Sequence, residues 1–199
     1  MNVGVVAIVI GPKYTSLFEQ YSRVRFDAYG RRHGYDTLII DKPIRELPGK
    51  KLTWQKCCLH DLEWVREKDL IAFLDSDTLI AKDAPPIPLV EFGKIGGVMD
   101  KPPAGLNSGV LIFRPGKEVA AMFEESLLDL DPFWDQVALE RVLRKNNALQ
   151  LIDPRFHCMF YIRSCRFFSA LFKRHWIYHS LHGKSKLAII HRLLGIQRR

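Results

Sequence analysis

The most constraining feature of this 199-residue sequence is an unbroken apolar run over residues 3–10, which ends at Gly11-Pro12. The run is rich in β-branched residues and shows no polar alternation, which is typical of a parallel strand buried on both faces. A helical period over residues 16–30 and a second apolar strand over 35–40 follow it. Because parallel neighbours need a crossover connection, this βαβ opening predicts an α/β fold with a mostly parallel, Rossmann-like sheet flanked by helices.

The rest of the chain continues this alternation, and we expect one domain over residues 1–199. We expect further helices over 52–67, 118–128 and 136–143, and strands over 70–74, 95–99, 109–113, 149–152 and 176–179. Residues 78–81 should continue the strand 70–74 in extended form, and the proline-rich residues 83–88 should form a loop. A basic amphipathic helix is expected at about 186–197. With 47% hydrophobic residues the chain can bury a proper core.

Basic residues outnumber acidic ones, since 30 Lys and Arg against 22 Asp and Glu give a formal net charge of +8. From Arg141 to the C-terminus the sole acidic residue is Asp153, so the positive charge is concentrated in the last third. This distribution indicates an anionic partner, which could be a nucleotide phosphate, a nucleic acid or an acidic membrane surface. A basic protein without such a partner explains the net charge equally well.

The apolar N-terminal segment lacks a basic leader and a small-residue cleavage site, and it is shorter than the roughly 20 residues that span a bilayer. The four cysteines, Cys57, Cys58, Cys158 and Cys165, show no C-x-x-C spacing. We therefore expect a cytoplasmic protein with reduced thiols in its core. The basic C-terminal region is a candidate for peripheral contact with a membrane.

Two carboxylates follow the expected strand 70–74 directly, in the sequence Asp75-Ser76-Asp77. Ligands of open α/β sheets bind beyond the carboxyl ends of the strands. In an extended backbone Asp75 and Asp77 point to the same side, where two like charges need a positive partner. A divalent cation with carboxylate and diphosphate ligands meets that need. The alternative is that this short motif merely caps the next element.

The residues around this motif resemble the glycogenin-type, family 8 glycosyltransferases of GT-A fold. The resemblance rests on four blocks that occur in the family order: LTWQKCCLHDLEWVREKDLIAFLDSDTLIAKD with its DXD motif, GLNSGVLIFRP, FWDQVAL and YHSLHGKSK. It implies a hexosyltransferase-type enzyme that moves a sugar from a nucleoside diphosphate sugar, with UDP-sugar favoured, to a glycan or other hydroxyl acceptor. It further implies Mn²⁺ or Mg²⁺ as the cofactor and retention of the anomeric configuration.

The resemblance also implies roles for single residues. The metal ligands would be Asp75, Asp77 and His179. The donor would be contacted by Ile10, Tyr14, Lys56, Asp75, Ser76, Asp77, Gly183 and Lys186. The reaction centre would be lined by Asn107, Asp135 and Gln136. In this scheme Tyr14 stacks on the base, Lys186 holds the diphosphate, and Asp135 is the first candidate for the carboxylate near the anomeric carbon, with Asp131 as the alternative.

One spacing departs from the family pattern. His179 precedes Gly183 and Lys186 by four and seven residues, where the family has three and six. His182 therefore remains an alternative metal ligand, although His179 ends a strand pattern that would hold a ligand rigidly.

Two other functions remain open from the sequence. A nucleotidyltransferase also sets acidic pairs at strand ends, but its glycine-rich basic loop is poorly matched by Ile-Gly-Pro-Lys-Tyr after the first strand. A nucleic-acid-binding domain explains the charge and the aromatic, basic segment 163–176, but it leaves Asp75-Ser76-Asp77 unexplained, so nucleic acid is a disfavoured partner. Trp54 and Trp64 are expected to pack in the core. Trp134, beside Asp135, suits packing and acceptor stacking equally.

Overall fold

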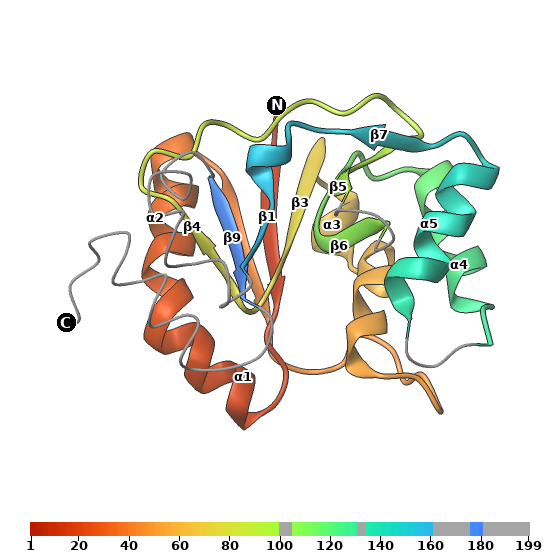
Figure 1. The fold of residues 1–199 in the computed structure, drawn as a ribbon, viewed down its shortest axis with the longest axis horizontal. Helices are drawn as coiled ribbons and strands as arrows, with labels where there is room; N and C mark the ends of the chain where they lie inside the picture. Colours follow the sequence, from red (N-terminus) through yellow and green to blue (C-terminus); the bar gives the residue numbers. More distant parts are fainter. Residues whose placement is uncertain (100–104, 131–133, 161–175, 181–199) are drawn as a thin grey trace.

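The computed structural model describes residues 1–99, 105–130, 134–160 and 176–180, and these form two β-sheets with helices around them (Figure 1). Within these residues the larger sheet has six strands in the order β2-β1-β3-β6-β5-β7, and the smaller has three in the order β4-β9-β8. The strands of the larger sheet are β1 (Val3–Ile8), β2 (Asp36–Ile40), β3 (Leu70–Asp75), β5 (Ile95–Met99), β6 (Leu106–Phe113) and β7 (Leu149–Leu151). Those of the smaller sheet are β4 (Thr78–Ile80), β8 (Cys158–Phe160) and β9 (Ile177–Ser180).

The helices lie on both sides of the larger sheet (Figure 1). On one side are α1 (Pro12–Leu17), the π-helical segment η1 (Phe18–Ser22) and α2 (Arg23–His33). On the other side are the 3₁₀ helix η2 (Leu52–Asp61), α3 (Glu63–Arg66), α4 (Lys117–Leu127) and α5 (Asp135–Lys145). A short 3₁₀ turn, η3 (Pro154–Phe156), precedes β8. The predicted α/β class is therefore confirmed.

Alternating side chains of the central strands enter two separate cores. Val5 of β1 packs in the same core as Phe26 of α2, whereas Val6 and Phe73 pack in the core that contains Leu139 of α5. Both faces of β1 are thus covered, as its unbroken apolar run predicted. The central strands are held by apolar contacts on either side, and this fixes where their carboxyl ends lie.

The order and direction of the strands decide which residues meet at the site. β1 pairs in parallel with β2 and β3, β5 pairs in parallel with β7, and β6 runs antiparallel to β3 and β5. Leu74 of β3 is paired with Val110 of β6. Because β6 runs against β3, the residues that open β6 lie beside the residues that end β3.

The expected helix over 52–67 is wrong in its type. It consists of the 3₁₀ helix η2 and the single turn α3, separated at Leu62, whose backbone is extended. A 3₁₀ helix advances three residues per turn, so its buried face differs from the one that an α-helical period predicts. Leu52 is accordingly 48% exposed, while Gln55 and Lys56 are buried.

The expected extension of β3 through residues 78–81 is also wrong. Ser76 and Asp77 form a turn, and β4 beyond it belongs to the smaller sheet, where it pairs with β9. The Thr78 hydroxyl donates to the Asp75 carbonyl oxygen at 2.7 Å and closes this turn. Asp75 and Asp77 therefore do not occupy alternate positions of one extended strand.

Other predictions concern the start of β6, the buried Trp54 and cysteines, and the helices. β6 begins at Leu106 rather than at residue 109, and so includes Asn107. Trp54 is fully buried, and Cys57 and Cys58 are buried thiols. Among the described helices, none combines the length and the apolar character needed to cross a bilayer. The expected basic helix at 186–197 lies outside the described residues.

Candidate functional site

The centre of the candidate site is Lys56, a charged side chain that the fold buries. Only 3% of its surface is exposed. Its ammonium nitrogen Nζ lies 3.1 Å from Asp135 Oδ2 and 3.4 Å from Asp75 Oδ1, and it donates to Ser108 Oγ at 2.9 Å. η2, β3, β6 and α5 each contribute one of these groups. The sheet topology thus brings three of the sequence blocks together, at the carboxyl end of β3.

Asp135 is the most deeply buried carboxylate of this group, with 8% of its surface exposed. It is the first residue of α5, where the positive end of the helix dipole favours a negative charge. Its Oδ2 accepts from Ser108 Oγ at 3.2 Å, and the Thr53 side chain also bonds to it. These contacts hold the carboxylate in one orientation.

The protonation states of Lys56 and Asp135 follow from two opposing effects, burial and the charge of the neighbouring groups. Burial alone lowers the pKa of Lys56, but the charges of Asp75 and Asp135 outweigh it and leave the pKa raised. Burial likewise raises the pKa of Asp135, but the Lys56 charge and the hydrogen bonds from Thr53, Lys56 and Ser108 outweigh it and leave that pKa lowered. At neutral pH the site therefore contains a cationic Lys56 and an ionised Asp135.

The Asp75-Ser76-Asp77 turn begins at the carboxylate that contacts Lys56, and all three of its residues are partly exposed. The backbone register of the smaller sheet pairs Thr78 of β4 with His179 of β9. The backbone of His179 therefore lies opposite Thr78, the residue that follows Asp77. The structure describes this strand pairing, while the position of the His179 imidazole lies outside what it describes.

Asn107 and Gln136 were both predicted at the reaction centre. Asn107 is buried within β6, and its Oδ1 accepts from the Gly109 backbone N–H at 2.8 Å. Gln136 is half-buried and follows Asp135 on α5. Asn107 directly precedes Ser108 and Gln136 directly follows Asp135. Ser108 and Asp135 both contact Lys56.

A polar pocket of about 420 Å³ lies between the helices α1 to α2 and the end of β2. Its lining residues are Val9, Thr15, Glu19, Arg23, Asp27, Thr37, Ile39 and Asp41. Ile8, the last residue of β1, is paired with Ile40 on one side and with Asp75 on the other. The pocket lies on the α2 side of the sheet, where Val9 and Ile39 pack, whereas Lys56 lies over Phe73 on the α5 side.

The predicted donor contacts Ile10 and Tyr14 lie beside this pocket in the chain but are not among its lining residues. Gly11, between them, has φ +96°, a left-handed conformation that suits glycine and lets the chain pass from β1 into α1. Tyr14 is 41% exposed on α1, so its ring is accessible from solution. Gly183, Lys186, His182 and Asp131 lie outside the described residues.

Two residues of this site, Ser108 and Thr53, were not predicted from the sequence. Ser108 lies within the quoted Asn-Ser-Gly block and Thr53 lies three residues before Lys56, so both stand next to predicted positions. No single-residue signal marks them, because their role depends on contacts between η2, β6 and α5.

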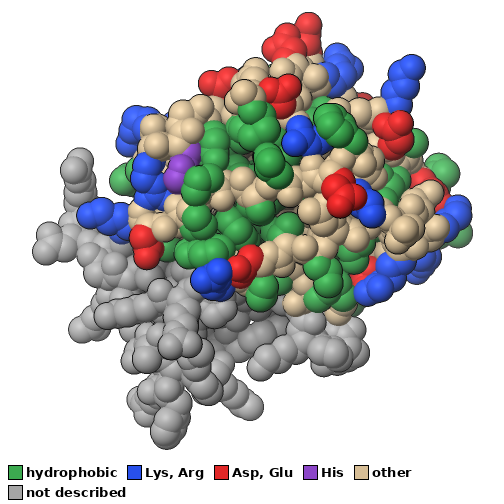
Figure 2. Space-filling view, turned by 90° about the horizontal axis from the view of Figure 1, so that it is seen from above, with side chains coloured by type: hydrophobic (Ala, Val, Ile, Leu, Met, Phe, Trp, Pro, Cys, Tyr) green, Lys and Arg blue, Asp and Glu red, His purple; other side chains and the backbone are tan. Residues whose placement is uncertain are grey.

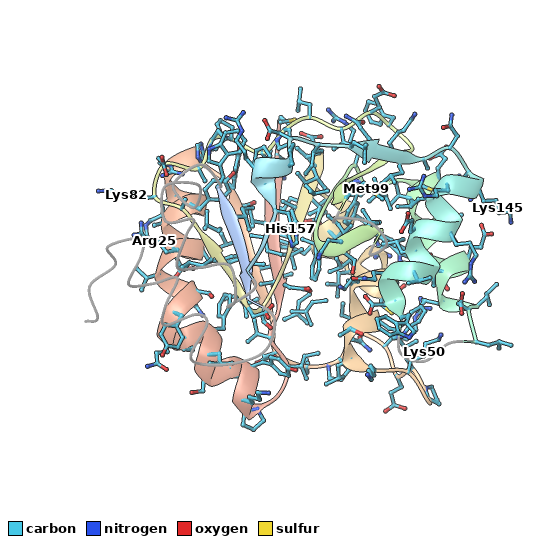
Figure 3. The ribbon with its side chains drawn as sticks, viewed as in Figure 1. Arg25, Lys50, Lys82, Met99, Lys145 and His157 are labelled. Atoms are coloured by element: carbon cyan, nitrogen blue, oxygen red, sulfur yellow. The ribbon has the colours of Figure 1, made fainter. Side chains whose placement is uncertain are left out.

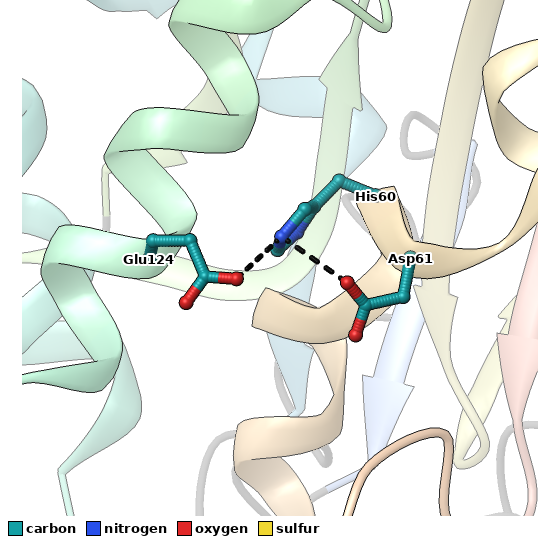
Figure 4. A group of neighbouring side chains, drawn as sticks. All are labelled: His60, Asp61 and Glu124. Carbon is teal, nitrogen blue, oxygen red and sulfur yellow. Dashed lines mark hydrogen bonds and ion pairs between the residues drawn. The ribbon is translucent and has the colours of Figure 1, made fainter.

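A second cluster of titratable groups joins η2 to α4 (Figure 4). His60 Nε2 lies 2.8 Å from Glu124 Oε1 and 3.5 Å from Asp61 Oδ1. Arg45 donates to both carboxylates, with Nη2 at 2.8 Å from Asp61 Oδ1 and 2.6 Å from Glu124 Oε1. The ligand atoms are close enough together for a metal ion. However, the Arg45 guanidinium already bonds to both carboxylates and offsets one of their two charges, so we interpret the cluster as a structural ion-pair network.

Comparison with solved structures identifies the class of fold. The crystal structure of a glycosyltransferase involved in the glycosylation of the major capsid of PBCV-1 matches with a TM-score of 0.71 at 15% identity, covering 97% of this chain and 98% of its own. The apo structure of the WbbM bifunctional glycosyltransferase matches with a TM-score of 0.61 at 12% identity, covering 97% of this chain and 49% of its own. No family model matches the chain, and no curated protein sequence matches it. At these identities the likeness shows the fold alone, which is that of a single-domain glycosyltransferase.

Proposed function

We propose that this chain is a glycosyltransferase that moves a sugar from a nucleoside diphosphate sugar to a hydroxyl group of a glycan or other acceptor. We further propose a UDP-sugar donor, a divalent metal and retention of configuration, as the resemblance to family 8 enzymes implies. The fold that this chain shares with two glycosyltransferases supports the first statement. The proposals of a UDP-sugar donor, a divalent metal and retention rest on the residues of the site.

The observation that carries the proposal is the burial of Lys56 between Asp75, Ser108 and Asp135. These residues come from separate elements and meet where ligands of α/β sheets bind. A buried cation held by two carboxylates is an expensive arrangement to maintain for stability alone, because apolar residues of similar volume commonly do as well. Burial with strong mutual perturbation of pKa values is a recognised property of functional sites.

The residues at the turn fit a hard divalent cation. Asp75 and Asp77 offer carboxylate oxygens on partly exposed side chains, and a carboxylate has about four lone-pair sites, so its contact with Lys56 is compatible with a metal bond. His179 is the proposed third ligand, and its backbone lies opposite Thr78. When bound, Mn²⁺ or Mg²⁺ would supply Lewis-acid stabilisation to the departing diphosphate.

The chain's own residues would prepare the sugar for transfer. Ionised Asp135, fixed by Lys56, Ser108 and Thr53, would place a negative charge beside the anomeric carbon, where positive charge develops in glycosyl transfer. The Asn107 and Gln136 side chains would bind sugar hydroxyls. The pocket at the end of β2 would accept the nucleoside, with the Tyr14 ring beside it and Lys186 on the diphosphate.

The nucleic-acid-binding alternative rested on the aromatic, basic segment 163–176, of which the structure describes Trp176. The contacts of Trp176 give this alternative no support. Trp176 packs against Phe156 with ring centroids 4.8 Å apart, and the Arg155 guanidinium lies 4.0 Å from the centre of the Trp176 ring. These contacts occupy the aromatic face that a base would need. Contact of the basic region 186–197 with a membrane stays a prediction.

Substitution at the turn tests the proposed function. Asp77→Ala should lower Mn²⁺-dependent hydrolysis or transfer of a UDP-sugar by at least about 100-fold, because it removes a metal ligand while leaving the cores intact. Calorimetry with UDP-sugars in the presence and absence of Mn²⁺ measures donor binding, and turnover assays measure the reaction. Asp83→Ala, an exposed acid in the loop after β4, is the matched control and should keep full activity. Full metal-dependent turnover by Asp77→Ala would show that this site assignment is wrong.

A further inference from the structure

An apolar surface lies beside the candidate site and has no part in the proposed chemistry. It consists of Leu128 and Leu130, in the segment after α4, and of Trp134 and Val137, at the start of α5. Their exposed fractions are 78%, 97%, 57% and 43%. We call these four residues the apolar rim. Large apolar side chains exposed together on a folded protein commonly mark an interaction surface.

An ion pair places the two halves of the rim side by side. Arg141 of α5 pairs with the carboxylate of Asp129, which lies between Leu128 and Leu130. Trp134, Val137 and Arg141 are spaced by three and four residues, so they share one face of α5. The Asp129–Arg141 contact therefore draws the 128–130 segment onto the face of α5 that presents Trp134 and Val137.

The rim lies at the same end of the molecule as the site. Trp134 directly precedes Asp135, and the Lys50 ammonium donates to the Asp129 carbonyl oxygen. Figure 3 shows Lys50 near the beginning of α5 and Lys145 at its far end. A partner bound to the rim would consequently reach the site from the α5 side.

The charges around the rim favour an anionic partner. Among the described residues, the Lys50 ammonium and the Arg141 guanidinium both contact Asp129, so two positive charges accompany one carboxylate at the rim. The Asp129 side chain is only 13% exposed, and that of Arg141 is 68% exposed, so the outward charge is positive. The chain as a whole carries a formal charge of +8.

We propose that the apolar rim docks this protein on an anionic lipid surface, with the leucines and Trp134 in the interfacial region and the flanking cations against the headgroups. Surfaces that bind at membrane interfaces combine leucine and tryptophan side chains with neighbouring Lys and Arg. A glycan would instead require hydrogen-bonding groups, which leucine and valine side chains do not have. Docking would present the site to acceptors held in that membrane, and this corollary alone rests on the proposed glycosyl transfer.

Vesicle binding tests the proposal without any measurement of activity. The full chain should sediment with vesicles of phosphatidylglycerol and phosphatidylcholine, and much less with phosphatidylcholine alone. Leu128→Ser with Leu130→Ser should weaken partitioning by about tenfold or more, because two apolar side chains leave the interface. Both side chains are exposed, so thermal unfolding should be unchanged.

A matched control comes from another exposed apolar group. Leu89 and Phe92, 60% and 82% exposed, belong to the loop after β4, which runs along the top of Figure 1. Figure 2 views that side of the molecule from above and shows hydrophobic side chains gathered on it. Leu89→Ser with Phe92→Ser should bind vesicles within about twofold of the unaltered chain. Brominated lipid should quench tryptophan fluorescence, and Trp134→Phe should remove most of that quenching.

Three results would overturn the proposal. They are the absence of any sedimentation with anionic vesicles, undiminished binding by the Leu128→Ser, Leu130→Ser variant, and loss of binding in the Leu89, Phe92 control. Undiminished binding by the rim variant would assign the contact to another surface, such as the basic C-terminal region. None of these results bears on whether the chain transfers sugar.

Discussion

Lys56 is a full positive charge in the interior, and the fold compensates for it with two carboxylates of different exposure. The Asp135 side chain is 10% exposed and that of Asp75 is 28% exposed. Removing Lys56 would leave Asp135 as a buried charge without its main partner, whereas Asp75 could still be hydrated. The energetic importance of Lys56 should therefore lie mainly in its pair with Asp135.

A double-mutant cycle measures this pair. Lys56→Met should lower the free energy of unfolding by about 3–5 kcal/mol, because it strands the Asp135 carboxylate. Asp135→Asn should cost about 1–3 kcal/mol, since the amide keeps some hydrogen bonds. Urea denaturation should show that the double variant is clearly less destabilised than the sum of the single changes. Strictly additive effects would mean that the two side chains do not stabilise one another.

Asp135→Asn also separates a functional role from a structural one. If Asp135 acts on the sugar, the variant should lose transfer at temperatures where it is still fully folded. Its donor affinity should change less than its turnover, because the charge matters most at the transition state.

The 3₁₀ helix η2 connects the site to the ion-pair network. Its first half supplies Thr53 and Lys56 to the site, and its end supplies His60 and Asp61 to the contacts with Arg45 and Glu124. The network fixes the end of η2 against α4 and so limits movement of the segment that carries Lys56. We expect its contribution to be modest, because its members are partly exposed.

The pH dependence of stability should reveal this network. Hydrogen bonding from Arg45, with a smaller contribution from His60, lowers the pKa of Glu124 to about 2, below its ordinary value of 4.5. The unfolded chain therefore binds a proton at Glu124 before the folded chain does. The stability that Glu124 contributes is fully present above pH 4.5 and is lost as the pH falls toward 2.

Glu124→Gln gives the corresponding measurement. At pH 7 it should lower the free energy of unfolding by about 1 kcal/mol, a value reduced for the exposure of the pair. The difference from the unaltered chain should shrink as the pH falls from 4.5 toward 2. A difference that stays constant with pH would exclude the linkage to Arg45.

Across the fold, the sequence predicts the helices and strands better than the way they are connected. The apolar runs of β1 and β3 predicted both strands, because burial on both faces requires apolar side chains at every position. The turn at Ser76 and Asp77 was missed, since Thr78 to Ala81 is as apolar as β3 itself and only pairing with β9 assigns it to another sheet. The family resemblance assigned Lys56, Asp75 and Asp135 separate roles around the donor, and neither it nor any local pattern predicted that Lys56 pairs with both carboxylates. Ser108 was missed for the same reason, because its contacts depend on β6 lying antiparallel to β3.

The proposed donor site lies where the two sheets join, and ligand binding should therefore stabilise both. UDP with Mn²⁺ at about 100 times its dissociation constant should add about 2.7 kcal/mol to the free energy of unfolding. For a chain of this size that corresponds to an increase of about 5–10 °C in Tm. UDP alone should do much less, because the diphosphate then lacks its cation.

Amide hydrogen exchange would show where that stabilisation acts. With UDP and Mn²⁺ together, exchange should slow at the end of β3 and also in β4, because Asp75 ends one and Asp77 precedes the other. Asp77→Ala should abolish the slowing in β4, while Asp83→Ala should keep it. Equal stabilisation by UDP with and without Mn²⁺ would argue against a metal at the turn. Slowing confined to β7 and the loop after β4 would place the nucleotide elsewhere on the molecule.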